Sequence, residues 1–160
     1  MDLYLLRHGE AEPRSASVAE ARRQLTEKGS RDVGRVIERS QTVKVKPGLI
    51  LSSPNVRARQ TADIAAEILK VKVEESSQLL PSVEPHLIWD ELREHADTQE
   101  IMLVGHEPHM SRLVSFLLMT MLAIDFKKGA LIRVEVDNPP AQPHGVLKWI
   151  LTPKLAGAVK

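Results

Sequence analysis

The sequence contains no cysteine among its 160 residues. Disulfide bonds and zinc sites built from thiolates are therefore excluded. The absence is compatible with a reducing compartment, and we expect a cytoplasmic protein. A chain of this length can bury about 70% of its unfolded surface without such cross-links. We therefore expect one domain that covers residues 1–160.

The sequence also lacks a surplus of charge and a long apolar run. It has 22 Lys and Arg against 21 Asp and Glu, a net charge of +1, which provides no long-range attraction to nucleic acid or to an anionic membrane. The apolar segment at residues 3–6 is too short for a secretory signal. The stretch at residues 113–124 contains Ser115 and Thr120 and is too short to span a bilayer. We therefore expect neither nucleic acid nor a membrane as a partner.

Short apolar segments alternate with helical patterns along the chain. We expect strands at residues 3–6, 49–51, 71–75, 101–104, 130–136 and 146–151, and helices at residues 26–40, 55–70, 85–95 and 108–122. Strands separated by helices indicate an α/β fold, a three-layer α/β/α sandwich with a mostly parallel central sheet. The last two strands are joined directly by a proline-rich loop at residues 137–145, which predicts an antiparallel edge.

Polar segments follow three of the predicted strands. They are residues 7–9 (Arg-His-Gly), residues 52–54 (Ser-Ser-Pro) and residues 105–106 (Gly-His). Ligands of open α/β sheets bind beyond the carboxyl ends of the strands. We therefore expect these three segments to meet at one edge of the sheet and to form a binding site there.

The segment at residues 7–9 combines groups that suit phosphoryl chemistry. Gly9 permits a tight turn after the strand, which leaves His8 at the edge of the sheet. A neutral imidazole is a competent nucleophile toward phosphorus, and the attack gives a phosphohistidine intermediate. The guanidinium group of Arg7 offers a planar fork that matches phosphate oxygens. The alternative is an arginine and a histidine in an ordinary surface turn.

Two further residues could complete a phosphate site. Arg57 falls in the first turn of the helix at residues 55–70, where a guanidinium group and the helix N-terminus can bind one anion; the alternative is an exposed helix arginine. His106 could donate a hydrogen bond to a transferring phosphoryl group; the alternative is a histidine that caps the turn before Pro108. His106 and His109 are too few ligands for a metal, so we expect neither a metal site nor a cofactor.

Four motifs occur in an order that is specific when taken together. They are residues 6–11 (LRHGEA), residues 25–29 (LTEKG), residues 52–62 (SSPNVRARQTA) and residues 103–108 (LVGHEP). This set resembles the histidine phosphatase superfamily, formerly grouped with phosphoglycerate mutases, and within it the small SixA-type phosphohistidine phosphatases. The resemblance implies that His8 is the nucleophile and that Arg7, Arg57 and His106 form the phosphate pocket.

The resemblance also implies further contacts to the substrate. Arg23 matches a position where SixA-like members carry another phosphate-contacting arginine, although Arg22 is adjacent and either side chain could point inward. Ser15 and Ser17, in the preceding loop, are additional candidates for substrate binding.

The chain departs from the larger members of the superfamily, which carry an acidic residue in a region inserted between the second arginine and the second histidine. Only about fifty residues separate Arg57 from His106, so we expect no inserted lid domain and a pocket that is open to a protein surface. Glu84 and Glu10 are the candidate acids. The alternatives are that Glu84 is a solvated loop residue and that Glu10 orients His8.

The leading hypothesis is a phosphatase that removes phosphate from phosphohistidine on a signalling or phosphorelay protein. Imidazole, with a reference pKa of about 6.5, leaves with little help, whereas an alkoxide needs a proton donor. We expect a monomer or a weak dimer. The alternatives are a small-molecule phosphomonoesterase of the same family and a non-catalytic module that binds phosphate or a phosphoprotein.

Overall fold

The computed structural model describes residues 1–137 and 142–158. In this part of the chain, one sheet has the strand order β3-β2-β4-β1-β5-β6. Its strands are β1 (Asp2–Arg7), β2 (Leu49–Ser52), β3 (Val73–Glu75), β4 (Glu100–Gly105), β5 (Leu131–Val136) and β6 (Gly145–Leu151). The first four pair in parallel, and β5 and β6 pair antiparallel at one edge. The expected mostly parallel sheet with an antiparallel edge is therefore confirmed.

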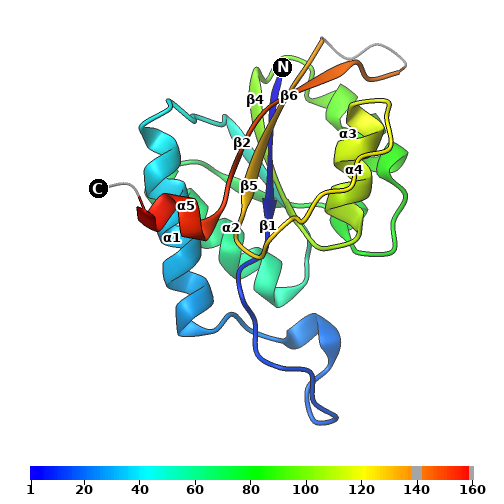
Figure 1. Cartoon of the computed structure of the whole chain (residues 1–160). Helices are drawn as coiled ribbons and strands as arrows, with labels where there is room; N and C mark the ends of the chain where they lie inside the picture. Colours follow the sequence, from blue (N-terminus) through cyan, green and yellow to red (C-terminus); the bar gives the residue numbers. More distant parts are fainter. Residues whose placement is uncertain (138–141, 159–160) are drawn as a thin grey trace.

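Helices cover both faces of this sheet and give three layers (Figure 1). One face carries α1 (Glu27–Gln41), α2 (Val56–Leu69) and the short α5 (Pro153–Ala158), and the other carries α3 (Pro85–Glu94) and α4 (His109–Leu117). Two 3-10 helices, η1 (Glu20–Arg22) and η2 (Ser77–Leu79), lie in the connections.

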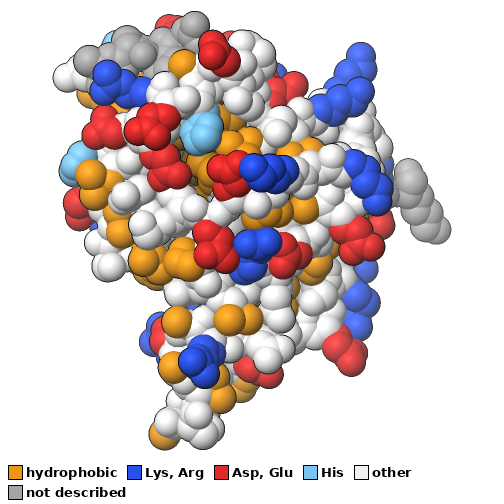
Figure 2. Space-filling model, turned by 180° about the vertical axis from the view of Figure 1, so that it is seen from behind, with side chains coloured by type: hydrophobic (Ala, Val, Ile, Leu, Met, Phe, Trp, Pro, Cys, Tyr) orange, Lys and Arg blue, Asp and Glu red, His pale blue; other side chains and the backbone are white. Residues whose placement is uncertain are grey.

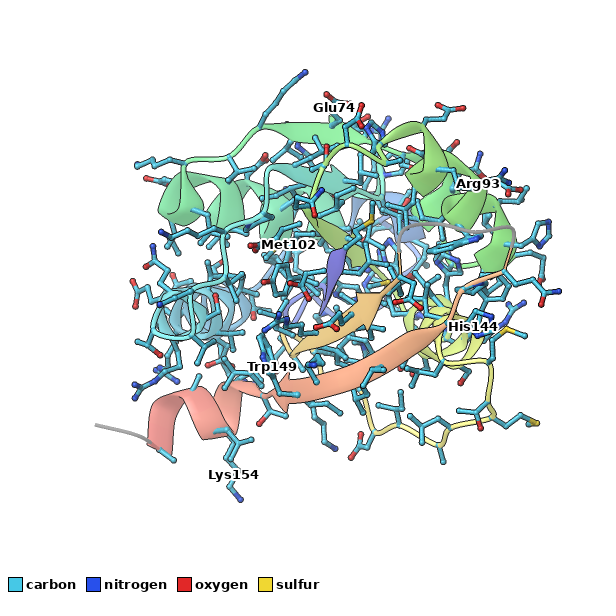
Figure 3. The ribbon with its side chains drawn as sticks, turned by 90° about the horizontal axis from the view of Figure 1, so that it is seen from above. Glu74, Arg93, Met102, His144, Trp149 and Lys154 are labelled. Atoms are coloured by element: carbon cyan, nitrogen blue, oxygen red, sulfur yellow. The ribbon has the colours of Figure 1, made fainter. Side chains whose placement is uncertain are left out.

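The sequence of β1 is apolar from Leu3 to Leu6 and does not alternate with polar residues, because both faces of this strand are covered. Leu3 and Leu5 pack in the core formed with α3 and α4, whereas Tyr4 and Leu6 pack in the core formed with α1 and α2. Successive side chains of a strand point to opposite faces, so a strand covered on both faces needs an apolar residue at every position. Met102 of β4, labelled in Figure 3, lies in the middle of the same layered packing.

Most predicted helices agree with the structure, and α4 is the main correction. The side chain of Thr26 caps α1 by accepting a hydrogen bond from the Gly29 N–H, as the sequence predicts. In contrast, α4 ends at Leu117 rather than at Leu122. Met119 has a left-handed φ of 51°, and the Thr120 N–H donates to the Ser115 carbonyl, which closes the helix in the way that left-handed residues often do.

Other differences are small. The sequence did not predict α5 or the two 3-10 helices, and β3 begins at Val73 rather than at Val71. The predicted loop at residues 137–145 lies partly outside the described residues. Residues 70–99 contain β3, η2 and α3, so no domain is inserted between α2 and β4. In residues 1–137 and 142–158, no helix has both the length and the apolar composition that crossing a membrane requires.

The sheet brings three polar segments to one edge, as expected. Arg7 at the end of β1 pairs with Gly105 at the end of β4, and Ser52 at the end of β2 pairs with Val104. The chain leaves β1 at this edge and projects below the body of the molecule before it returns to α1 (Figure 1), and the same projection is visible from behind in Figure 2.

The turn after β1 packs against the start of α1 so closely that it requires glycine. A Cβ atom on Gly29 would lie 2.1 Å from the Glu10 carbonyl oxygen, and a Cβ atom on Gly9 would lie 2.9 Å from the Gly29 carbonyl oxygen. Larger residues at either position would push the turn away from the helix. The glycines therefore help to determine where His8 lies.

Candidate active site

A cavity of about 230 Å³ lies at the carboxyl ends of β1 and β4. Five residues that the sequence predicted line it together, namely Arg7, His8, Arg23, Arg57 and His106. Four other lining residues were not predicted, namely Arg14, Glu20, Glu107 and Lys128. The cavity therefore gathers side chains that are far apart in the sequence, from Arg7 to Lys128, around one small volume.

His8 has a hydrogen-bond environment that defines its tautomer. Its Nδ1 atom lies 2.7 Å from the Gly9 carbonyl oxygen, which can only accept, so Nδ1 carries the proton and donates it. The lone pair of Nε2 then faces Arg57, whose Nε–H donates to it at 3.2 Å. The imidazole therefore presents an unprotonated Nε2 toward the arginine side of the cavity.

The pKa of His8 favours the same neutral form. Burial, and then the positive charges of Arg57 and Arg7, lower this pKa to about 4, against an opposing effect of the hydrogen bond to Gly9. The side chain is almost fully buried. At neutral pH His8 is therefore an uncharged imidazole, which is the form that can act as a nucleophile.

His106 lies beside His8, with ring centroids 5.1 Å apart. Its Nε2 atom lies 2.8 Å from the Ser53 hydroxyl oxygen, and Ser53 is held in turn by its N–H bond to the Val104 carbonyl. Burial, and then the neighbouring His8 and Arg57, lower the pKa of His106 to about 3. Within the described residues its Nδ1 atom is buried without a hydrogen-bond partner.

Two guanidinium groups flank the histidines. Arg7 donates from Nη1 to the Phe126 carbonyl at 2.5 Å, and its buried Nε has no partner among the described residues. Arg57 is 4% exposed, as its position in the first turn of α2, next to the end of β2, allows. Thr61, one turn later, accepts from the Gly9 N–H at 3.1 Å and so ties the His8 turn to the helix that carries Arg57.

Glu20 occupies the outer part of the cavity among three arginines. Its carboxylate lies 2.7 Å from Arg23, 3.1 Å from Arg57 and 3.2 Å from Arg14. Although burial opposes the effect, the guanidinium groups of Arg23, Arg57 and Arg14 hold the pKa of Glu20 below its usual value. The arginines that would bind a substrate phosphate therefore already surround an anion of the protein.

Glu107 is the second carboxylate of the cavity, and both of its oxygen atoms are engaged. One accepts from the Ser111 N–H at 3.0 Å and the other accepts from the Ser111 hydroxyl. These bonds attach Glu107 to the first turn of α4. The sequence offered a signal for this residue, because it directly follows His106 in the predicted turn.

Several predicted residues lie outside the cavity. Glu84 pairs with Arg112 at 2.5 Å on the surface, and Glu10 contacts Thr26 and Lys28. Neither carboxylate lines the cavity that contains His8. The structure therefore does not bring either candidate acid together with the nucleophile.

The segment after β1 carries four of the candidate substrate-binding residues, Ser15, Ser17, Arg22 and Arg23. Ser15 and Ser17 are exposed and bond to each other at 3.1 Å, away from the cavity. Arg23 points inward while Arg22 is exposed, so Arg23 is the one of the two that lines the cavity. Among residues 1–137 and 142–158, no three His, Cys, Asp or Glu side chains are grouped so that they could hold a metal ion.

Two sequence comparisons find proteins that are similar to this chain. The family model described as the histidine phosphatase superfamily (branch 1) matches residues 3–80. An uncharacterized protein of Picosynechococcus sp. (strain ATCC 27264 / PCC 7002 / PR-6) is 32% identical over 149 residues, which are 90% of each chain.

Solved structures are similar over nearly the whole chain. The protein histidine phosphatase SixA complexed with tungstate has a TM-score of 0.85 at 24% identity, over 96% of this chain and 98% of that chain. A mutant phosphoserine phosphatase from Entamoeba histolytica in complex with phosphoserine has a TM-score of 0.73 at 15% identity, over 96% and 98%. A mycobacterial glucosyl-3-phosphoglycerate phosphatase has a TM-score of 0.73 at 16% identity, over 92% and 97%. At these identities the structural matches establish the fold.

Proposed function

Because the chain belongs to the histidine phosphatase superfamily, we propose that it hydrolyses a phosphoryl group through a covalent intermediate on His8. The observation that carries this proposal is the arrangement around Nε2 of His8. The atom is unprotonated, it belongs to a neutral imidazole, and it faces a guanidinium group that can bind phosphoryl oxygens.

In the first step the substrate phosphoryl group enters between His8 and the arginines. The Nε–H of Arg57 transfers its hydrogen bond from His8 to a phosphoryl oxygen, which frees the lone pair of Nε2. Nε2 then attacks phosphorus while the bond to the leaving group breaks and the leaving group keeps the electron pair. Arg7 and His106 stabilise the charge on the equatorial oxygens.

In the second step water hydrolyses the phosphoenzyme. The proton stays on Nδ1, which donates it to the Gly9 carbonyl oxygen. Phosphorylated His8 is therefore an imidazolium group, and it departs from phosphorus as neutral imidazole. Water adds to phosphorus, the Nε2–P bond breaks, and its electron pair returns to Nε2. One proton of the water stays on the product phosphate and the other passes to solvent.

The surroundings of His8 favour a substrate whose leaving group needs no proton donor. Glu20 is held ionised by three arginines, and Glu107 accepts hydrogen bonds at both oxygens. Neither carboxylate is placed as an acid toward the leaving group. Imidazole has a reference pKa of about 6.5 and departs unaided, whereas an alkoxide does not. We therefore propose phosphohistidine on a protein as the substrate.

The test compares leaving groups on one enzyme. We expect phosphohistidine in a peptide to be hydrolysed with a kcat/KM at least about 10²-fold above that of an alkyl phosphate, since general acid catalysis contributes about that much. For a series of aryl phosphates, kcat/KM, which reports the step in which the phenol leaves, should fall steeply as the pKa of the phenol rises. Equal kcat/KM values across this series would contradict the absence of an acid.

One observation favours a small-molecule phosphomonoesterase as the second candidate. Glu107 lines the cavity next to His106, and movement of Ser111 would release it as an acid. In that case Glu107→Gln would lower kcat for alkyl phosphates about 10²-fold or more. If the substrate is phosphohistidine, Glu107→Gln should leave kcat within a few fold of the wild type.

A further inference from the structure

A larger hollow of about 680 Å³ adjoins the reaction cavity. We call it the basic groove, and its cationic lining residues are Arg7, Lys28, Arg35, Lys127, Lys128 and Lys154. Arg7 and Lys128 also line the cavity that contains His8. The basic groove and the proposed reaction site therefore lie next to each other, with Arg7 and Lys128 in the walls of both.

Positive charge is concentrated in the basic groove. Its six cationic residues face only two acidic lining residues, Asp32 and Asp125, which leaves a net charge of +4, whereas the whole chain has a net charge of +1. Figure 2 shows that on the back of the molecule acidic and basic side chains alternate instead. The groove is therefore a local feature and does not reflect the average surface.

Part of this charge has no partner in the protein. Asp32 pairs with Lys28 at 2.9 Å, and Asp125 pairs with Lys127 at 2.6 Å. In the described part of the chain, Lys128 and Lys154 form no ion pair. Figure 3 shows that the side chain of Lys154 extends from α5 into solvent, away from the body of the molecule. These amines are available to an external anion.

The spacing of the cations indicates the kind of anion. In the reaction cavity, Arg14, Arg23 and Arg57 converge on one carboxylate, as a site for a single phosphate requires. In the basic groove the cations come from the end of β1, from α1, from the segment before β5 and from α5, and they line a volume much larger than one phosphate group. Such an array suits several carboxylates that are distributed along a peptide.

We propose that the basic groove docks an acidic segment of the phosphorylated substrate protein while its phosphohistidine enters the cavity at His8. This inference rests on the proposed function, because it assumes a protein substrate. No domain is inserted between α2 and β4, and Arg7 and Lys128 line both hollows, so a substrate segment next to the phosphohistidine would lie beside the groove. The docking gives substrate preference through charge complementarity.

The experiment uses two synthetic peptides with the same phosphohistidine, one flanked by four glutamates and the other by four glutamines. At low salt, wild-type protein should hydrolyse the glutamate peptide with a kcat/KM about tenfold higher, because several exposed ion pairs act together. The preference should shrink toward unity at about 0.5 M salt.

Charge-reversal variants of lysines in the basic groove test whether the groove causes the preference for the glutamate peptide. Lys127→Glu/Lys154→Glu should remove or invert the preference and leave the rate on the glutamine peptide within about twofold of the wild type. Lys154→Glu alone should reduce the preference about threefold. The matched control is Lys46→Glu, which makes the same change at an exposed lysine that precedes β2, at the opposite end of the sheet. This control should keep the wild-type preference.

The outcomes separate the two proposals. If wild-type protein hydrolyses both peptides at equal rates, or if the double variant keeps the preference, docking is overturned and the phosphohistidine activity stands. If wild-type protein hydrolyses neither peptide but does hydrolyse an alkyl phosphate, the proposed function fails and the docking proposal fails with it. Stronger inhibition by an RNA oligonucleotide than by the unphosphorylated glutamate peptide, lost in the double variant, would assign the groove to nucleic acid.

Discussion

The candidate site has two regions that differ in how firmly the fold holds them. The pocket floor, formed by His8, Ser53, Arg57, Thr61 and His106, is between 0% and 6% exposed. The pocket rim consists of Arg14, Glu20 and Arg23 on the projecting segment after β1, and the side chains of Arg14 and Glu20 are 82% and 47% exposed. We infer that the floor determines the chemistry and that the rim adjusts the affinity for substrate.

Arg57 joins the two regions. Its Nε–H donates to His8 in the floor, while its Nη1 and Nη2 contact the carbonyl and the carboxylate of Glu20 in the rim. Changes in the floor should therefore lower kcat, and changes in the rim should act on KM or on phosphate affinity. Variants of floor and rim residues test this division.

Replacing the nucleophile should have the largest effect. His8→Ala removes the only group that can form the proposed intermediate, and we expect kcat to fall by at least about 10⁴-fold. A matched control is His144→Ala, at an exposed histidine outside the cavity, which should retain wild-type kcat. Substantial turnover by His8→Ala is incompatible with the proposed mechanism.

Arg57→Ala should lower kcat/KM by about 10²- to 10³-fold, because it removes a guanidinium group that stabilises phosphoryl charge. Arg59→Ala is a suitable control on the same helix, since Arg59 pairs with Asp63 and Glu75 on the surface. In steady-state kinetics, kcat/KM of Arg57→Ala should lie far below that of Arg59→Ala. Equal losses would mean that the effect comes from the helix and not from the pocket floor.

Three histidines of the described residues are buried, His8, His106 and His109, and burial lowers the pKa of each. The two that line the cavity, His8 and His106, predict a pH-dependent stability. Their pKa values in the folded protein, about 4 for His8 and about 3 for His106, lie below the value of about 6.5 expected in the unfolded chain. As the pH falls below about 6.5, the unfolded chain binds protons first, so the free energy of unfolding decreases until these folded-state pKa values are reached.

Between pH 7 and pH 5 we expect a loss of about 1–2 kcal/mol for each histidine, measurable by urea unfolding. The double variant His8→Ala/His106→Ala should show a much shallower decrease over the same range. An equally steep decrease in this variant would show that other groups cause it. Activity should not fall with protonation of His8 until the pH approaches 4.

The rim should give the smallest effect. Glu20→Gln removes an anion that competes with phosphate for Arg23 and Arg57, so we expect inorganic phosphate to inhibit about threefold more strongly, with kcat unchanged. Glu12→Gln, on the same exposed segment but outside the cavity lining, is the control. Weaker inhibition in Glu20→Gln would mean that Glu20 positions the arginines and does not compete with the substrate.

The floor was predictable from sequence for a physical reason. His8, Arg57 and His106 follow β1, β2 and β4, and parallel strands in one sheet place their carboxyl ends at the same edge. The predicted fold class was correct because the strands and helices that build the three layers have clear apolar patterns, although the short α5 does not. The predicted end of α4 at Leu122 was wrong because apolar residues continue beyond Leu117 into a segment that is not helical.

The rim was less predictable. Glu20 lies in a polar segment with neither a helical nor a strand period, so nothing in the sequence indicates that it turns back to Arg57. The choice between Arg22 and Arg23 depends on the same path. Lys154 was missed because it lies in α5, a helix of six residues that shows no pattern of its own.

The central claim is that Nε2 of His8 carries the phosphoryl group between the two steps. Rapid quenching at alkaline pH during turnover of a phosphohistidine peptide, followed by mass spectrometry, measures this directly. We expect a phosphorylated protein with the phosphate on Nε2 of His8, and none in His8→Ala. A phosphate on another residue, or turnover with no phosphorylated protein when chemistry is slowed enough to trap it, would contradict the account.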